Sequence, residues 1–265
     1  MYHFINRDVT VSMTYMKQAI ELWKTNLVYL INTFEGFMSI YYNYLLMALN
    51  SDCLEKVFQD IDTYKQLINT YKPNLGKVSP IHGRLFETAS WIEMGALNKC
   101  KRFKEVILNL TIVHTKAQQY SDYIGDDFWV GYCYNAALAH FGMQEYKSAI
   151  DYLDKIHNKK KSLYYIKHQV EIKSMYLLAH YEMGNSRFLK YEIQKARYYV
   201  EKEKINNVLF ECLLKLIHSL LKVERISETC LEKVEKMKRK IPQQDKDMKY
   251  KNLLFVINLW SKAKI

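Results

Sequence analysis

The side chains that most often perform catalysis or bind metals are scattered through this sequence. The eight histidines lie mostly on separate predicted helices, and one pair with metal-ligand spacing, Asp154 and His157 at i, i+3, has no second pair to complete a site. Residues 76–79 (Gly-Lys-Val-Ser) partly match a phosphate-binding loop, but Tyr71 replaces the required glycine and Val78 the required Ser or Thr. No H-E-x-x-H, G-x-S-x-G or G-x-G-x-x-G motif occurs. We therefore expect a protein that is not an enzyme and uses no metal or other cofactor.

Cysteine usage and hydropathy bear on the compartment. The cysteines are odd in number, widely spaced and without a C-x-x-C pair, which favours a reducing compartment over a disulfide framework. They are Cys53, Cys100, Cys133, Cys212 and Cys230. Arg7 and Asp8 interrupt the first residues before any apolar run, and the longest uncharged stretch, 36–51, is too short to span a membrane. We expect a cytoplasmic protein with no membrane partner.

Turn-forming residues are rare, and this indicates helices. With 8 Gly and 3 Pro in 265 residues, the chain lacks the turn chemistry of an all-β or doubly wound fold. Apolar residues recur at helical spacing almost throughout, as at Ala149, Leu153 and Ile156. The predicted helices span residues 9–31, 36–51, 53–71, 80–99, 102–119, 126–142, 145–157, 161–183, 186–203, 205–222, 227–240 and 246–263.

The predicted helices repeat in pairs. Candidate second helices begin near residues 54, 103, 146 and 188, at intervals of roughly 40 to 50 residues. We expect one helical-repeat domain over residues 1–265, closed by a capping helix at 246–264. The first predicted helix reads as a second helix without its first, which favours a chain that is the C-terminal part of a longer protein.

One segment resembles a known repeat family. Residues 134–142 (Tyr-Asn-Ala-Ala-Leu-Ala-His-Phe-Gly) followed by 145–153 (Glu-Tyr-Lys-Ser-Ala-Ile-Asp-Tyr-Leu) resemble a tetratricopeptide repeat. In that family a small residue of the first helix packs on a small residue that starts the second, here Ala137 on Ala149. The best match covers roughly residues 126–200. The resemblance implies an all-α, right-handed solenoid of about six helix hairpins.

The resemblance also implies a binding site. In the family, first helices line a concave groove that holds a protein or peptide partner. The matching positions here are Tyr42, Trp91, Asn98, Lys99, Tyr134, Leu138, Glu171, Leu178 and Tyr181. Tyr42, Trp91 and Tyr134 recur at one repeat position, and we expect them to be at least partly exposed on one surface that Tyr181 extends. The alternative is that these aromatic side chains fill space between first helices.

The charge distribution supports a second hypothesis about function. The formal net charge is +11, and residues 222–265 contain 12 Lys and Arg against 6 Asp and Glu. If the chain is instead a nucleic-acid-associated or transcription-regulatory module, the basic C-terminal residues contact phosphate. These residues are Lys236, Lys238, Arg239, Lys240, Lys246, Lys249 and Lys251. Without a base-reading motif, we expect weak and non-specific binding of nucleic acid.

Overall fold

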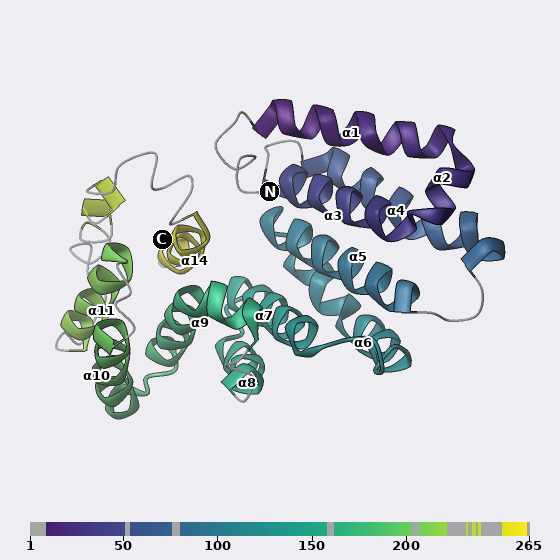
Figure 1. The fold of residues 1–265 in the computed structure, drawn as a ribbon. Coiled ribbons are helices and arrows are strands. Elements are labelled where there is room, and N and C mark those ends of the chain that lie inside the picture. Colours follow the sequence, from purple (N-terminus) through teal and green to yellow (C-terminus); the bar gives the residue numbers. More distant parts are fainter. Residues whose placement is uncertain are drawn as a thin grey trace. The chain divides into compact units, whose positions relative to one another are not determined.

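Every regular element in the described part of the chain is an α-helix (Figure 1). The computed structural model describes residues 9–50, 54–75, 80–157, 162–202, 207–221 and 251–263, together with Glu232, Glu235, Lys236, Lys238 and Arg239. The helices are α1 (Val9–Thr25), α2 (Leu27–Asn32), α3 (Phe34–Asn50), α4 (Leu54–Leu75), α5 (Pro80–Lys99), α6 (Phe103–Gln119), α7 (Asp126–Gly142), α8 (Tyr146–His157), α9 (Leu163–Glu182), α10 (Ser186–Lys202), α11 (Val208–Leu220) and α14 (Lys251–Lys262). The predicted all-α class is confirmed.

Most helix bounds follow the sequence signals, with one break that the signals did not predict. The helix expected over 9–31 divides into α1 and α2 at Asn26, whose side-chain oxygen accepts a hydrogen bond of 3.1 Å from the Tyr29 N–H. An N-capping asparagine starts a new helix because it satisfies a backbone N–H that has no partner within the helix. The helix expected over 227–240 lies largely outside the described residues, and so does the phosphate-loop-like run 76–79.

Three helix pairs are joined by the same kind of turn. The links α5–α6, α7–α8 and α9–α10 each place one residue in the left-handed region, at Lys101 (φ 58°), Gln144 (φ 63°) and Gly184 (φ 71°). The next residue then donates its N–H to the carbonyl five residues earlier: Arg102 to Leu97 at 2.8 Å, Glu145 to His140 at 2.9 Å and Asn185 to His180 at 3.1 Å. This hydrogen bond satisfies a carbonyl at the end of the first helix, and the turn reverses the direction of the chain. The turns follow one another at intervals of about 40 residues.

The chain forms two compact units, residues 1–128 and 129–265, which we describe separately. In unit 1, α3 packs against α1, α4 and α5, and α5 packs against α6. The apolar core of α1 to α5 includes Phe37, Leu45, Ile61 and Leu85, all nearly inaccessible to solvent.

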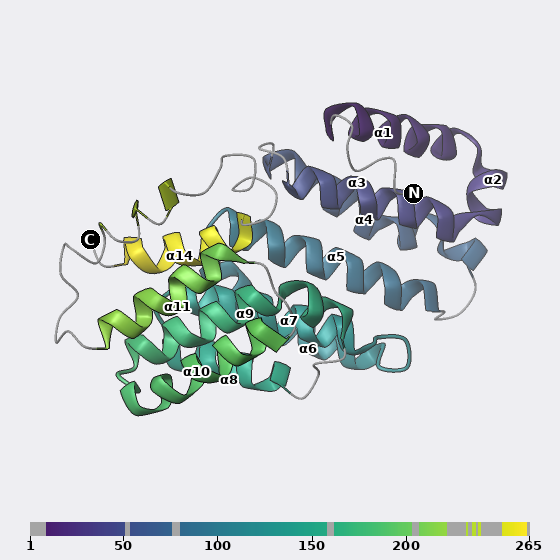
Figure 2. The ribbon, with the colours of Figure 1, turned by 60° about the vertical axis from the view of Figure 1, so that its left-hand side comes forward.

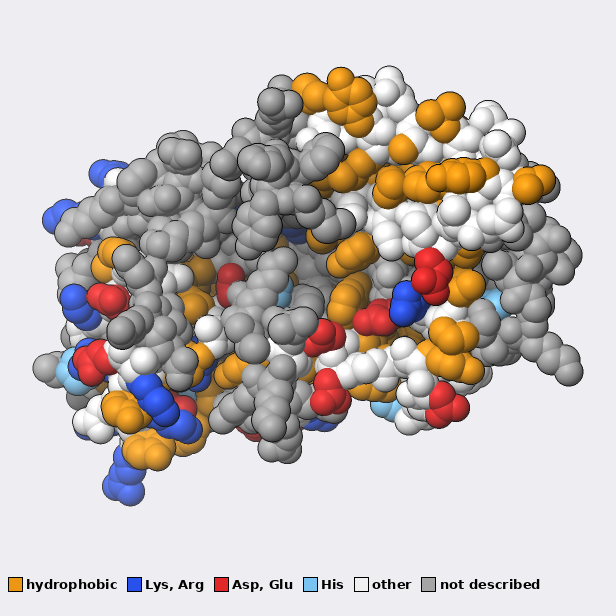
Figure 3. Space-filling view, viewed as in Figure 1, with side chains coloured by type: hydrophobic (Ala, Val, Ile, Leu, Met, Phe, Trp, Pro, Cys, Tyr) orange, Lys and Arg blue, Asp and Glu red, His pale blue; other side chains and the backbone are white. Residues whose placement is uncertain are grey.

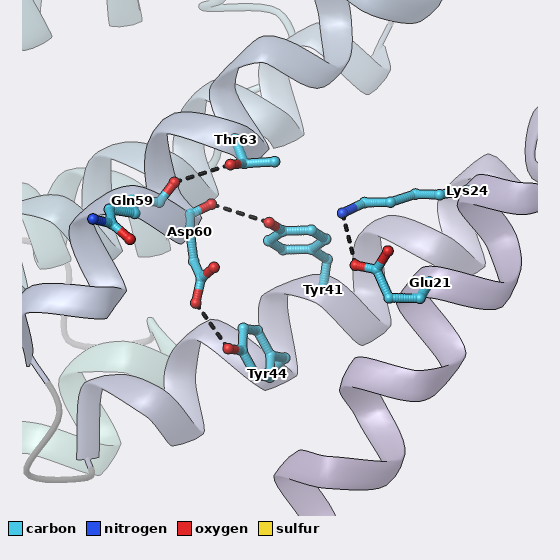
Figure 4. Close-up of polar contacts among 7 residues, drawn as sticks. All are labelled: Glu21, Lys24, Tyr41, Tyr44, Gln59, Asp60 and Thr63. Atoms are coloured by element: carbon cyan, nitrogen blue, oxygen red, sulfur yellow. Dashed lines mark hydrogen bonds and ion pairs between the residues drawn. The ribbon is translucent and has the colours of Figure 1, made fainter.

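Tyrosines tie α3 to α4 inside unit 1 (Figure 4). The Tyr44 hydroxyl donates to Asp60 Oδ2 at 2.8 Å, and the Tyr41 hydroxyl donates to the Asp60 carbonyl at 3.2 Å. Burial, reinforced by Asp60, raises the pKa of both phenols well above their ordinary value of 10. Figure 4 also shows the α1 ion pair Lys24–Glu21 at 3.0 Å, with the Lys24 ammonium 6.0 Å from the Tyr41 ring centroid. Tyr41 and Tyr44 are therefore core residues whose hydroxyls are satisfied.

In unit 2 the helices α8 to α11 lie side by side (Figure 2). The Tyr152 ring of α8 stacks on His140 of α7 with 5.4 Å between centroids, and the Tyr176 hydroxyl of α9 donates to Asp154 of α8 at 3.1 Å. Ala137 and Ala149 are both fully buried, as close helix packing requires. Their mutual contact stays a prediction.

The helix expected at 246–264 is α14, and it packs against α9. Its apolar side chains Leu253, Val256, Ile257 and Trp260 are buried. Residues 246–250 lie outside the described part of the chain. The role of this helix as a cap stays a prediction.

Candidate functional site

The expected groove residues are divided between the two units. Unit 1 contains Tyr42 on α3 and Trp91, Asn98 and Lys99 on α5. Unit 2 contains Tyr134 and Leu138 on α7 and Glu171, Leu178 and Tyr181 on α9. A single row through both units stays a prediction, so each group is considered by itself.

Trp91 is half-buried and firmly oriented. Its indole Nε1 donates to the Phe128 carbonyl at 3.3 Å, and its ring stacks on Phe128 with 6.3 Å between centroids and 17° between planes. Phe86 also packs on Phe128, with 5.9 Å between ring centroids, and on Tyr120, with 5.4 Å between centroids. A tryptophan held on one side and still partly open to solvent is the kind of rigid aromatic group that dominates binding interfaces.

A half-buried carboxyl lies on the same face of α5 as Trp91. Glu87 precedes Trp91 by four residues, one helical turn. Burial, followed by the negative charge of Asp127, raises the pKa of Glu87 to about 7, and Arg84 opposes the shift. Burial and the charge of Glu87 in turn raise the pKa of Tyr42, so Tyr42 and Glu87 interact. We call Tyr42, Glu87, Trp91 and Asp127 the Trp91 cluster.

We predict that Glu87→Gln changes the pH dependence of stability. The pKa of Glu87 in the folded protein is raised above its ordinary value of 4.5, so the folded state favours the protonated carboxyl. The contribution of this carboxyl to the free energy of unfolding is therefore fully present below pH 4.5 and is lost as pH rises through about 7. Wild type and Glu87→Gln should therefore be equally stable near pH 4. The variant should be more stable by about 1 to 2 kcal/mol near pH 8, after discounting for solvent screening of a half-exposed group. Urea unfolding at both pH values measures this, and an equal difference at both would contradict it.

Asn98 is buried, and Lys99 caps the end of another helix. Asn98 is 1% exposed. The Lys99 ammonium donates to the Leu49 carbonyl in the last turn of α3 at 2.6 Å, where a cation complements the helix dipole. Ligand binding by either residue stays a prediction.

The unit 2 residues are more buried than expected. Tyr134 is 6% exposed because its ring stacks on His168 of α9, with 5.6 Å between centroids. The expectation that Tyr134 is partly exposed is therefore wrong. Leu138 and Leu178 are also buried, while Glu171 is half-buried. Helix α9 supplies the Tyr134 ring with a contact that a ligand would have supplied. Ligand binding by Leu138, Glu171 and Leu178 stays a prediction.

Tyr181 remains half-buried, and α14 covers part of it. Trp260 meets the Tyr181 ring edge-on, with 6.2 Å between centroids and 79° between planes. The Trp260 indole Nε1 donates to Glu182 Oε1 at 2.6 Å. Helix α14 thus occupies the side of α9 on which the resemblance placed the end of the groove.

Comparison with protein-family models, curated proteins and solved structures gave no match. The function proposed below rests on the residues and their geometry.

The basic C-terminal residues are described only in part. Lys236, Arg239 and Lys251 are exposed, whereas Lys238 forms an ion pair with Glu235 at 2.6 Å. Lys240, Lys246 and Lys249 lie outside the described residues.

The described residues contain no group of three or more His, Cys, Asp or Glu side chains that could hold a metal ion. Asp154, one member of the i, i+3 pair, accepts the Tyr176 hydroxyl. Among the described helices none is both long and apolar enough to cross a membrane. Glu87 and Asp127 were not singled out from the sequence. The available signals were the i, i+4 spacing of Glu87 and Trp91 and the acidic first turn of α7.

Proposed function

We propose that this chain is a non-catalytic scaffold that binds a protein or peptide, built as a tetratricopeptide-like, right-handed solenoid of helix hairpins and working in the cytoplasm. The recurring three-residue turns and the packed pairs α5–α6 and α9–α10 support the repeat architecture. Within the described residues, Cys100, Cys133 and Cys212 take part in no disulfide, which fits a reducing compartment.

The observation that carries the binding proposal is the Trp91 cluster. Trp91 loses little freedom on binding because Phe128 already fixes its ring and its N–H. Tyr42 adds a second half-buried aromatic ring, and Glu87 adds an acceptor whose charge is partly suppressed at neutral pH. An aromatic anchor beside a few polar groups is the composition of a peptide-binding surface.

Trp91→Ala tests this function. We expect binding to weaken by about 2 kcal/mol or more, roughly 30-fold in Kd, because the indole is the anchor. Unfolding should be affected less than for a fully buried tryptophan, because Trp91 is half-buried. The probe is a peptide selected from a random-sequence display library on the wild-type chain, with Kd measured by calorimetry.

Leu108→Ala is the matched control, since Leu108 is an exposed apolar residue of α6 in the same unit. It should leave the Kd unchanged. The proposal fails if the selected peptides bind Trp91→Ala as tightly as wild type. It also fails if the variant loses about 3 to 5 kcal/mol of stability without a specific binding defect, because Trp91 would then be a core residue.

The exposed Lys236, Arg239 and Lys251 favour the second candidate function, a nucleic-acid-associated or transcription-regulatory module. Binding through these lysines and arginines should be weak, independent of sequence and strongly reduced by salt. Tight and sequence-dependent binding in about 150 mM salt would promote this function over peptide binding.

A further inference from the structure

Helix α10 has an unusual outward face. One side of the helix is buried and consists of Leu189, Ile193, Ala196 and Val200, so the opposite side faces solvent. That opposite side follows the spacing i, i+4, i+7, i+11, i+15. Its residues are Arg187, Tyr191, Gln194, Tyr198 and Lys202. We call these five residues the α10 face.

Two tyrosine rings stand on this face with little support. Tyr191 is 62% exposed and Tyr198 is 65% exposed. They are separated by two helical turns, about 10 Å along the axis. Other tyrosines of the chain, such as Tyr41 and Tyr44, place their rings in a core. Rings turned away from the core contribute little to folding, whereas a planar partner could stack on them.

The rings lie among positive charges. Helix α10 contains five Lys and Arg and two Glu, and Glu192 is paired with Lys195 at 3.0 Å. The Lys195 ammonium lies 5.8 Å from the Tyr191 ring centroid. Arg187, Lys190, Arg197 and Lys202 are exposed and form no ion pair with any residue of the described ranges. Figure 3 shows blue and orange side chains mixed at the lower left, where Figure 1 places α10.

We propose that the α10 face binds single-stranded nucleic acid. Bases stack on Tyr191 and Tyr198, and the flanking cations contact phosphates, the combination by which proteins bind single strands without sequence preference. A duplex fits less well because its bases are already stacked on one another. An acidic peptide would use the cations and leave the rings unused. A membrane would need aliphatic side chains, and the α10 face has none.

This inference does not depend on the peptide-binding function. It also differs from the second candidate function, because α10 is separate in sequence from the basic C-terminal residues. The two surfaces should respond differently to substitution. The basic C-terminal residues supply positive charge alone, whereas the α10 face supplies both positive charge and aromatic rings.

The test measures binding of a fluorescein-labelled 20-nucleotide oligo(dT) to the full chain by anisotropy, at about 50 to 200 mM salt. Tyr191→Ala/Tyr198→Ala should weaken binding at least tenfold, because each ring stacks on a base. Tyr191→Phe/Tyr198→Phe keeps both rings and should bind within about twofold of wild type. Arg187→Gln/Arg197→Gln should weaken binding and reduce the salt dependence by roughly 0.7 in slope per lost phosphate contact.

Two controls locate the site. Tyr15 of α1 is 63% exposed, nearly the same as Tyr198, and Tyr15→Ala should not change the affinity, whereas Tyr198→Ala should lower it. Lys236→Gln/Arg239→Gln should have the smaller effect of the two charge variants. All these side chains are exposed, and circular dichroism checks that each variant is folded.

The proposal is overturned if wild type does not bind the oligo(dT) or if the tyrosine-to-alanine pair binds like wild type. Equal losses from Tyr15→Ala and Tyr198→Ala also overturn it, as does a loss confined to Lys236→Gln/Arg239→Gln. Tighter binding of a poly-glutamate peptide or of anionic lipid vesicles than of the oligo(dT) would assign the face to an acidic protein or a membrane instead.

Discussion

Trp260→Ala is expected to lower the free energy of unfolding by about 3 to 5 kcal/mol, which makes it one of the two most destabilising changes that we predict. Trp260 is 1% exposed and is the largest of the fully buried side chains. Truncation leaves a cavity against α9, removes the edge-to-face contact with Tyr181 and removes the N–H that donates to Glu182. Urea unfolding followed by circular dichroism measures the loss.

Trp260→Phe removes less of the indole than alanine does. The variant loses the N–H donor and part of the bicyclic ring, so it should cost about 1 to 3 kcal/mol, less than alanine. A loss below about 1 kcal/mol for Trp260→Ala would mean that α14 contributes little to unit 2. Equal losses for both variants would place the effect in the part of the indole that both remove, which includes the N–H that donates to Glu182.

Phe128→Ala should also cost about 3 to 5 kcal/mol, and it should disturb the Trp91 cluster. Phe128 is fully buried, and its ring contacts both Trp91 and Phe86. Its carbonyl belongs to the backbone, so the Trp91 N–H keeps its acceptor while the indole loses its stacking partner. We therefore expect a lower free energy of unfolding together with weaker peptide binding, measured by urea unfolding and by calorimetry.

Phe128→Leu is the matched control. It keeps most of the volume and should cost less than about 1.5 kcal/mol, but it removes the ring that orients Trp91. If Phe128→Leu binds peptide more weakly but keeps nearly the same free energy of unfolding, then Phe128 contributes to binding by orienting Trp91 and not only by filling the core. Unchanged binding in both variants would show that Trp91 needs no support from Phe128.

Local signals in the sequence were enough for most of the helices. The predicted spans 80–99 and 126–142 are the bounds that α5 and α7 have in the structure. The α9–α10 turn contains Gly184, which adopts the left-handed conformation without the cost of a Cβ. Each of these signals acts over a few neighbouring residues, which is why a sequence reveals them.

The other two turns were less accessible to sequence reasoning. Lys101 and Gln144 adopt the same left-handed conformation as Gly184, although side chains other than glycine rarely do so. The only glycine near the α7–α8 turn, Gly142, is the last residue of α7, and Gln144 makes the turn. The hydrogen bond from Glu145 to His140 stabilises this geometry whatever residue occupies the turn position.

The sequence by itself determined the all-α class. We also predicted from it the residues of an aromatic surface, and that surface stays a prediction. Only the tertiary structure decided which of those residues remain open: Trp91 stays half-buried, Tyr134 is covered by His168, and Tyr181 is partly covered by Trp260. It also buried Glu87, which raises the pKa of this carboxyl, and brought Asp127 close enough for its charge to add to the shift. The physical reason is that helix formation depends on residues within one or two turns. Exposure and pKa depend on which distant helices pack against a side chain, and no local pattern records that packing.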